Sequence, residues 1–568
     1  MIFKRSIFWI ILYLSQLKIG AGETNVVVDT AYGPVKGILN TEKGVKIASF
    51  LGIPYAKPPI GSRRFTRPDS INPWKQTYDA TRFQPECFTA HKKDTFNHSE
   101  DCLYMNIWAP RNGTSRLRPV LFYIHGGGFV DGTARIPGLL FSALSNAVVV
   151  SMNYRLNLFG FLNLYVEESP GNMGLLDQQL ALEWINANIG YFGGDRYDIT
   201  ILGMSAGGAS VGYHLLSPKS HNLFQRAAMH SGSPIDTWAF DTKDETLIKA
   251  RELADLVRCN GSDATEDPKR LIKCLQNIPA KILNSKNVKI KLVRPMTFSF
   301  VPTVDNLFIS DTPTELIRKG KFKITNIIIG TDKNDGGSFV PESFPEYFKH
   351  GFPTGSQIVD ITKAMYPKLS KMQLTKVLNK YFKNLEDPLR RKNNTIEAGY
   401  MMGDTGFVCP SLFLAESMTA FGGKAFYYQF VHKKSGSESW IDVPHGVDLV
   451  YLFGTVQQSS YYTVPEKKLS ERIVSQWVDF AKNGQLSQFP FGIPIEFFRR
   501  GTPRYFFLFL TINNNHWNFS FNFNSDSWHL RHSHGLYTPY IYVECITNVM
   551  NSIFAPFMTV DLYFRVYV

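Results

Sequence analysis

The sequence predicts an α/β fold with a large, mostly parallel central sheet flanked by helices. Two continuous apolar runs, at 119–124 and 147–152, are typical of strands that are buried on both faces. A third β-branched run follows at 199–202, and the segment 175–185 between the last two runs has helical spacing. Strand, helix and strand in this order indicate crossover connections between parallel strands.

The other expected elements are defined by apolar runs and turn signals. In the helix at 175–185, the residues Leu176, Leu180 and Trp184 lie four apart and should share one face. A short antiparallel pair is expected around the turn at Gly33 and Pro34. Further strands are expected at 326–330 and 425–430, and a helix at 465–483 that ends at Gly484.

Composition excludes several classes of protein. The 568 residues are 44% hydrophobic and 19% charged, which are values of a globular chain. The formal net charge of +13 comes without a compact basic block or a basic-aromatic repeat. We therefore interpret the charge as a solvated surface and expect no nucleic-acid partner.

The N-terminus has the pattern of a secretory signal peptide. Lys4 and Arg5 precede an apolar run at 7–14, and small residues follow at 20–22. The run is too short to span a bilayer, and no later stretch offers about 20 apolar residues without charge. We expect a signal peptide over 1–21, a folded domain over 22–505, and a secreted, extracellular protein without a transmembrane segment.

Cysteine spacing agrees with export. Of six cysteines, two pairs lie 15 residues apart around polar segments, which predicts the local disulfides Cys87–Cys102 and Cys259–Cys274. The other two cysteines, Cys409 and Cys545, either pair or stay free. Five Asn-x-Ser/Thr sequons predict a glycoprotein: Asn97, Asn112, Asn260, Asn393 and Asn518.

The stretch 199–210 carries the chemistry around which the chain is organised. Its strand leads into Gly203-Met204-Ser205-Ala206-Gly207 and then into a segment of small residues, the order strand, tight turn, helix. Glycines are needed because the turn is sharp. The turn would raise the Ser205 hydroxyl above the sheet edge at a helix N-terminus, where negative charge is favoured. On the pentapeptide alone, an inert serine in a turn is an equal alternative.

Three consecutive glycines, Gly126 to Gly128, follow the strand at 119–124. Backbone without side chains lets two N–H groups point at one place, as an oxyanion hole requires. A serine nucleophile also needs a base and an orienting acid, each in a loop after a strand. His445 is the candidate base, and either Asp335 or Asp332 is the candidate acid.

These motifs, taken together, resemble the type-B carboxylesterase and cholinesterase family. Among its members the chain is most similar to the secreted insect carboxylesterases, including those of hymenopteran venom. The resemblance runs from about residue 25 to about residue 485. The matching stretches are 51–56 (LGIPYA), 100–103 (EDCL), 125–129 (HGGGF), 153–155 (NYR), 171–172 (GN), 175–178 (LLDQ), 192–195 (FGGD) and 203–208 (GMSAGG).

The resemblance implies an α/β-hydrolase fold and hydrolysis of carboxylic esters through an acyl-enzyme. It implies a small-molecule ester as substrate and no cofactor or metal. By position, the catalytic residues would be Ser205 as nucleophile, His445 as base and Asp335 as acid. The amides of Gly127, Gly128 and Ala206 would form the oxyanion hole, and Arg64 with Glu100 and Arg155 with Asp177 would form buried, structural ion pairs.

The chain departs from the family pattern at several positions. The acid is normally Glu before Gly, whereas here Asp335 precedes Gly336, so the backbone must approach His445 by roughly one C–C bond. The first disulfide loop lacks the tryptophan that binds choline in cholinesterases, which argues against acetylcholine as substrate. Juvenile hormone esterases usually have Gln where Met204 stands. Residues 506–568 form an atypical, Phe-, Asn- and Tyr-rich tail.

Two other functions compete with a secreted serine carboxylesterase. A cholinesterase-like binding or adhesion protein keeps the fold and loses catalysis, but it is expected to lack the serine or the histidine. A stoichiometric scavenger of esters or organophosphates would keep both residues and turn over slowly. The sequence does not separate the scavenger from an efficient esterase.

Overall fold

The computed structural model describes residues 24–90, 97–111, 113, 116–259, 266–292, 294–437, 439–486, 508–513 and 516–518. The expected signal peptide, two of the sequons (Asn112 and Asn260) and Cys545 lie outside these residues.

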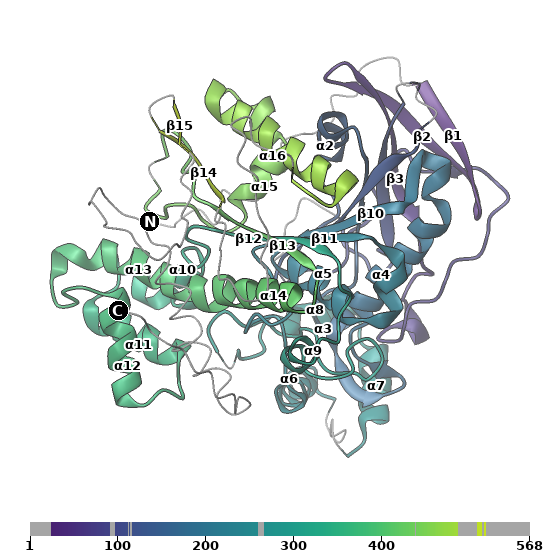
Figure 1. The fold of residues 1–568 in the computed structure, drawn as a ribbon. Helices are drawn as coiled ribbons and strands as arrows, with labels where there is room; N and C mark the ends of the chain where they lie inside the picture. Colours follow the sequence, from purple (N-terminus) through teal and green to yellow (C-terminus); the bar gives the residue numbers. More distant parts are fainter. Residues whose placement is uncertain are drawn as a thin grey trace.

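A mixed, mostly parallel sheet forms the centre of the molecule (Figure 1). Within the described residues it has 13 strands in the order β1-β2-β3-β5-β7-β6-β10-β11-β12-β13-β14-β15, with β4 beside β2. The strands β7, β6, β10, β11, β12, β13 and β14 run parallel to one another. Their bounds are β1 Thr24–Thr30, β2 Gly33–Glu42, β3 Val45–Pro54, β4 Tyr78–Asp79, β5 Tyr104–Pro110, β6 Arg118–Ile124, β7 Val148–Met152, β10 Gly194–Met204, β11 Arg226–His230, β12 Asn326–Asp332, β13 Lys424–Phe430, β14 Leu508–Asn513 and β15 His516–Asn518.

The short strands β8 (Asn163–Val166) and β9 (Ser169–Pro170) form a separate antiparallel pair. The helices are α2 Gly138–Ser145, α3 Asn157–Phe161, α4 Met173–Asn188, α5 Ala206–Leu216, α6 Lys243–Leu256, α7 Pro268–Asn277, α8 Ala280–Asn287, α9 Pro313–Arg318, α10 Phe339–Ser343, α11 Gly355–Met365, α12 Lys371–Tyr381, α13 Arg391–Gly403, α14 Cys409–Ala420, α15 Val447–Leu452 and α16 Val464–Asn483.

Helices cover both faces of the sheet, and the alternation of side chains along each strand decides which layer a residue joins. In β10, Ile201 packs into the layer that includes α4, α5 and α14, whereas Leu202 packs into the layer with α2, α15 and α16 (Figure 1). Both residues are buried, which explains why this strand is an uninterrupted apolar run.

The predicted strands and helices are present, with one correction: the turn between β1 and β2 lies at 31–32, because Gly33 and Pro34 already pair within β2.

The expected face of α4 packs against the core. Trp184 is buried, and Leu176 and Leu180 are partly buried against the same cluster. Leu175 and Ile185 are fully buried as well, because the helix is enclosed on most sides.

The helix expected at 465–483 is α16, and its ends follow local rules. Thr463 forms a capping box with Glu466, and Pro465 occupies the first turn, where its missing N–H has no partner to lose. The helix stops at Gly484, whose φ of 65° lies in the left-handed region that favours glycine.

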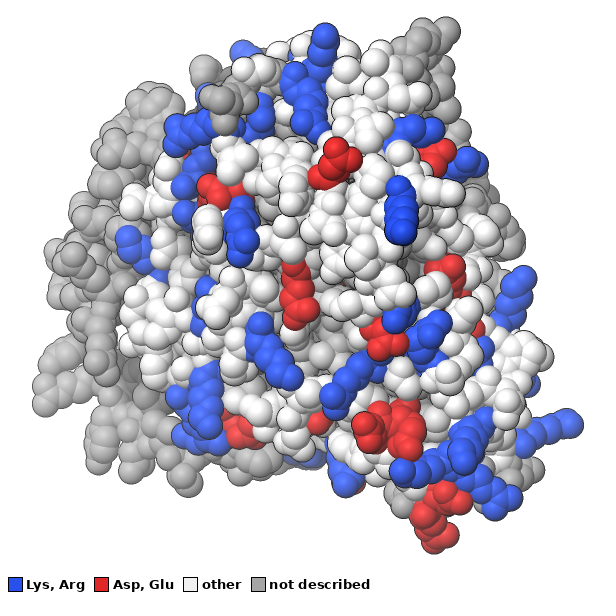
Figure 2. Space-filling view, turned by 90° about the vertical axis from the view of Figure 1, so that its right-hand side faces the viewer, with Lys and Arg blue, Asp and Glu red and all other residues white. Residues whose placement is uncertain are grey.

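Both predicted disulfides, Cys87–Cys102 and Cys259–Cys274, are present. Cys409 is also disulfide-bonded. No helix in the described part of the chain is long and apolar enough to cross a membrane. On the face shown in Figure 2, Lys and Arg side chains are interspersed with acidic ones over most of the surface.

Candidate active site

The sharp turn predicted at Ser205, which we call the elbow, lies where β10 ends and α5 begins. Ser205 sits between them with φ 57° and ψ −124°, a backbone conformation that a non-glycine residue rarely adopts. Its N–H donates to the carbonyl oxygen of His230 at 2.8 Å. Strain of this kind is held by the surrounding structure and is frequent at functional sites.

Neighbouring backbone leaves no room for side chains around Ser205. A Cβ on Gly207 would lie 2.0 Å from the carbonyl oxygen of Ile124, and one on Gly203 would lie 2.3 Å from the carbonyl carbon of Gly207. A Cβ on Gly232 would lie 2.1 Å from the Ser205 carbonyl oxygen. The need for glycine at 203 and 207 follows from the sequence motif, whereas Gly232 carries no such signal.

The glycine strip 126–128 runs directly against the elbow. A Cβ on Gly126 would meet the carbonyl oxygen of Met204 at 2.4 Å, and Gly127 and Gly128 have φ values of 113° and 61°. Within the described part of the chain, the N–H groups of Gly127, Gly128 and Ala206 donate to no protein acceptor. These three donors are available to an oxygen atom of a ligand.

His445 and Asp335 are brought together by the loops that follow β13 and β12. The Nδ1 atom of His445 lies 2.8 Å from Oδ1 of Asp335. The other carboxylate oxygen, Oδ2, accepts from the Ser231 hydroxyl at 2.8 Å and from the Asp332 N–H at 2.9 Å. The Nε2 atom of His445 is buried and has no partner among the described residues, so it can exchange a proton with a reacting group.

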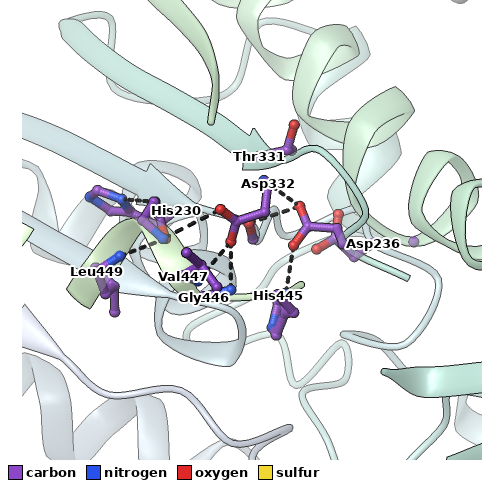
Figure 3. Close-up of polar contacts among 12 residues, drawn as sticks. His230, Asp236, Thr331, Asp332, His445, Gly446, Val447 and Leu449 are labelled. Atoms are coloured by element: carbon purple, nitrogen blue, oxygen red, sulfur yellow. Dashed lines mark hydrogen bonds and ion pairs between the residues drawn. The ribbon is translucent and has the colours of Figure 1, made fainter. Parts of the chain in front are cut away.

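Asp332, the other candidate acid, has a different role. Its carboxylate accepts the backbone N–H groups of Gly446 at 2.6 Å, Val447 at 3.1 Å and Asp448 at 3.3 Å (Figure 3). It therefore caps the start of α15, directly after His445, and satisfies donors that a helix N-terminus leaves free. The structure places Asp335, and not Asp332, against the imidazole.

The shorter side chain of Asp335 reaches His445 because the two loops pair. The Asn334 N–H donates to the carbonyl oxygen of Val443 at 2.9 Å, and Asn334 forms a bridge with Pro444. Burial raises the pKa of Asp335, although the hydrogen bonds and charge from His445 and the hydrogen bond from Ser231 oppose the shift.

Comparisons with known proteins identify the family. The model of the "Carboxylesterase family" matches residues 24–522. The chain belongs to the carboxylesterase family. It is also similar to an acetylcholinesterase from Bungarus fasciatus, with 35% identity over 486 residues that cover 82% of this chain and 79% of that protein. The parallel sheet with helices on both faces is the α/β-hydrolase fold of this carboxylesterase family.

Aromatic side chains connect the glycine strip to His445 in this carboxylesterase-family chain. A Cβ on Gly128 would meet the ring of Phe298 at 2.4 Å, and Phe298 contacts Trp238 with ring centroids 6.1 Å apart. Phe407 lies 5.7 Å from Trp238 and 4.7 Å from His445. Phe339 lies 5.2 Å from His445. We call the four residues Trp238, Phe298, Phe339 and Phe407 the aromatic wall.

Sequence reasoning missed the aromatic wall because its residues come from four separate segments. Phe407 belongs to a π-helix, Asp404–Val408, which continues α13 into α14. Such single turns are frequent at functional sites, but no residue pattern in this chain announces one. The Trp238 indole N–H donates to the Gly406 carbonyl at 2.9 Å and ties the wall to this turn.

The two ion pairs implied by the family resemblance are both present; Arg155–Asp177 is buried, whereas in Arg64–Glu100 the glutamate is only partly buried. Arg64 contacts Glu100 at 2.6 Å and Arg155 contacts Asp177 at 2.7 Å. Each arginine also donates to backbone carbonyl groups, so the pairs hold loops around the site. Within the described ranges, no cluster of His, Cys, Asp and Glu could hold a metal ion.

Proposed function

We propose that the protein is a secreted serine carboxylesterase that hydrolyses carboxylic esters through an acyl-enzyme on Ser205. Three features at the same edge of the sheet carry this proposal. They are the strained elbow at Ser205, the unpaired amides of the glycine strip, and the His445–Asp335 pair. Membership of the carboxylesterase family supports it. The signal-like N-terminus and the disulfides support secretion.

In the first step, Nε2 of His445 takes the proton of the Ser205 hydroxyl while Oγ attacks the ester carbonyl carbon. Asp335 accepts the Nδ1–H of His445, which fixes the tautomer and stabilises the imidazolium that forms. His445 then donates its proton to the departing alcohol. A water molecule attacks the acyl-enzyme by the same route, and release of the acid restores Ser205.

The carbonyl oxygen carries negative charge in each tetrahedral intermediate. The N–H groups of Gly127, Gly128 and Ala206 would bind this oxygen, and removal of one such donor costs about 3 kcal/mol of transition-state stabilisation in comparable enzymes. Because these donors are backbone groups of the glycine strip and of the start of α5, which pack closely against one another, they need no reorganisation during the reaction.

The aromatic wall bears on substrate class. Trp238, Phe298 and Phe407 present apolar rings between an oxyanion donor and the base. We propose neutral esters with an apolar acyl or alcohol group as substrates. Acetylcholine is a poor candidate, because the first disulfide loop carries Phe88 and no tryptophan between Phe88 and Glu100.

The test is hydrolysis of a short-chain nitrophenyl ester by the purified, secreted protein. We expect sustained turnover in the wild type and a loss of about six orders of magnitude in kcat for Ser205→Ala. Ser210→Ala, in the same helix, is the matched control and should retain turnover. A single burst without turnover would indicate a scavenger, and no reaction in a folded protein would favour the binding function.

A further inference from the structure

His230 links the elbow that carries Ser205 to the loop and helix that follow His445, through its backbone and its side chain. It is the last residue of β11 and is 1% exposed. Its carbonyl oxygen accepts the Ser205 N–H at 2.8 Å, and its Nδ1 lies 2.8 Å from Oδ2 of Asp448. Asp448 follows His445 by three residues, in the first turn of α15. Figure 3 shows His230 across the central carboxylates from His445.

The contact with Trp477 shows which ring nitrogen of His230 carries the proton. The indole N–H, which can only donate, points at Nε2 of His230 at 3.2 Å. Nε2 is therefore the acceptor, and the ring proton lies on Nδ1, from which it is donated to Asp448. The Tyr428 hydroxyl lies 2.5 Å from the same carboxylate oxygen and 2.7 Å from Nδ1. Both side chains thus support Asp448 as an anion.

Asp448 in turn fixes the segment that carries the base. Its backbone N–H donates to Asp332 at 3.3 Å, and its Oδ1 accepts the Leu449 N–H at 2.8 Å. Ser231, which follows His230 in the chain, donates a hydrogen bond from its hydroxyl to the carboxylate of Asp335. Two successive residues at the end of β11 therefore contact the nucleophile, the acid and the loop of the base.

The charges around His230 explain why this contact matters. Burial alone would raise the pKa of Asp448, but the hydrogen bonds from His230 and Tyr428 outweigh burial and hold it below its usual range. Asp332 and Asp335 are buried close by, and Tyr123 of β6 also faces Asp448. Without the His230 donor, a buried carboxylate next to the His445 loop would lose a partner, and the loop would be free to shift.

Resting on the proposed esterase function, we propose that His230 is a positioning residue that sets the distance between the Ser205 hydroxyl and the His445 imidazole. The contact to Asp448 is the part that matters for the reaction. The contact to Trp477 orients the ring and contributes to stability.

The experiment compares substitutions that break one contact or both, measured with a nitrophenyl ester and by thermal unfolding. His230→Phe removes both contacts and should lower kcat by about 10- to 100-fold with KM changed less than about threefold, because displacement of a catalytic group by about 1 Å has effects of this size. His230→Asn keeps an N–H donor near the Nδ1 position and should recover kcat to within about fivefold of the wild type.

Trp477→Phe is the matched control. It removes only the donor to Nε2, so it should lower the melting temperature and leave kcat within about twofold. Asp448→Ala removes the acceptor of the same contact and should reproduce the kcat loss if His230→Phe does not fold. Equal kcat in all variants, or kcat losses that track melting temperature and appear equally in Trp477→Phe, would overturn the inference while the esterase function stands. Absence of turnover in the wild type would overturn both.

Discussion

The two halves of the site are held by different forces. On the nucleophile side, Ser205 and the glycine strip are fixed by backbone atoms that approach one another without side chains between them. On the acid–base side, His445 is fixed by buried carboxylates, each with its own set of donors. Close packing of backbone tolerates no added atom, whereas a hydrogen-bond network can lose members one at a time. A single substitution on the nucleophile side should therefore abolish activity, whereas substitutions on the acid–base side should lower it in steps.

The largest effect is expected on the nucleophile side. Gly207→Ala places a Cβ 2.0 Å from the Ile124 carbonyl oxygen, and neither backbone can move without displacing a central strand. We expect a loss of about 3 kcal/mol in the free energy of unfolding, measured by denaturant titration, together with loss of ester hydrolysis. Gly190→Ala, where the added Cβ meets nothing within 4 Å, is the control. Full activity in Gly207→Ala would show that the elbow is not rigid.

The next effect separates the two candidate acids. Asp335→Asn should lower kcat by about four orders of magnitude, because the amide no longer fixes the required tautomer of His445. Asp332→Asn weakens the cap of α15 and should lower the free energy of unfolding by about 1 kcal/mol, the usual worth of a capping interaction, with a far smaller loss of kcat than Asp335→Asn. Steady-state kinetics on both variants measures this, and the reverse order would assign the acid to Asp332.

Glu416, a carboxylate outside both halves of the site, shows how burial changes a pKa when no hydrogen-bond donor opposes it. Glu416 of α14 has its pKa raised by burial alone, from 4.5 to about 7. The folded state binds this proton more tightly than the unfolded chain, so the contribution to stability is complete below about pH 4.5 and is lost as the pH rises through about 7. Glu416→Gln should be more stable than the wild type by about 3 kcal/mol at pH 8 and equal to it near pH 4. Equal pH dependence of the two melting temperatures would contradict this.

The smallest effect concerns the aromatic wall, which borders both halves. Phe407→Val removes a ring that contacts Trp238 and His445. We expect kcat/KM for a butyrate nitrophenyl ester to rise about tenfold relative to the acetate ester, since added space in an apolar pocket is worth about this much. Phe421→Val, at a ring that is 43% exposed, is the control. An unchanged ratio would remove Phe407 from the substrate-binding surface.

The same contrast explains which parts of the site could be predicted from the sequence. The elbow and the glycine strip are contiguous motifs whose function depends on backbone, so they could be recognised once the other family motifs were read beside them. The residues alone left the choice between Asp335 and Asp332 open, and the family resemblance favoured Asp335. The contact itself depends on the pairing of Asn334 with Pro444 across two loops. In α4, periodicity indicated one packed face but not that Leu175 is buried more deeply than Leu176, because that depends on enclosure by neighbours.

Side-chain clusters assembled from distant segments left no signal. His230 is one histidine at the end of a short strand. Its partners Tyr428, Asp448 and Trp477 lie in β13, α15 and α16, far along the sequence. The aromatic wall likewise requires the tertiary fold before its members become neighbours. Such sets are found by geometry, because nothing in local spacing distinguishes them from ordinary core residues.

The central claim is that Ser205 is a nucleophile activated by His445. The most direct test is reaction of the folded protein with a fluorophosphonate, followed by digestion and mass spectrometry. The account predicts one stoichiometric adduct on the peptide that contains Ser205, no adduct in Ser205→Ala, and much slower labelling in His445→Ala. An adduct at another residue, or no adduct in a protein that unfolds cooperatively, would contradict it.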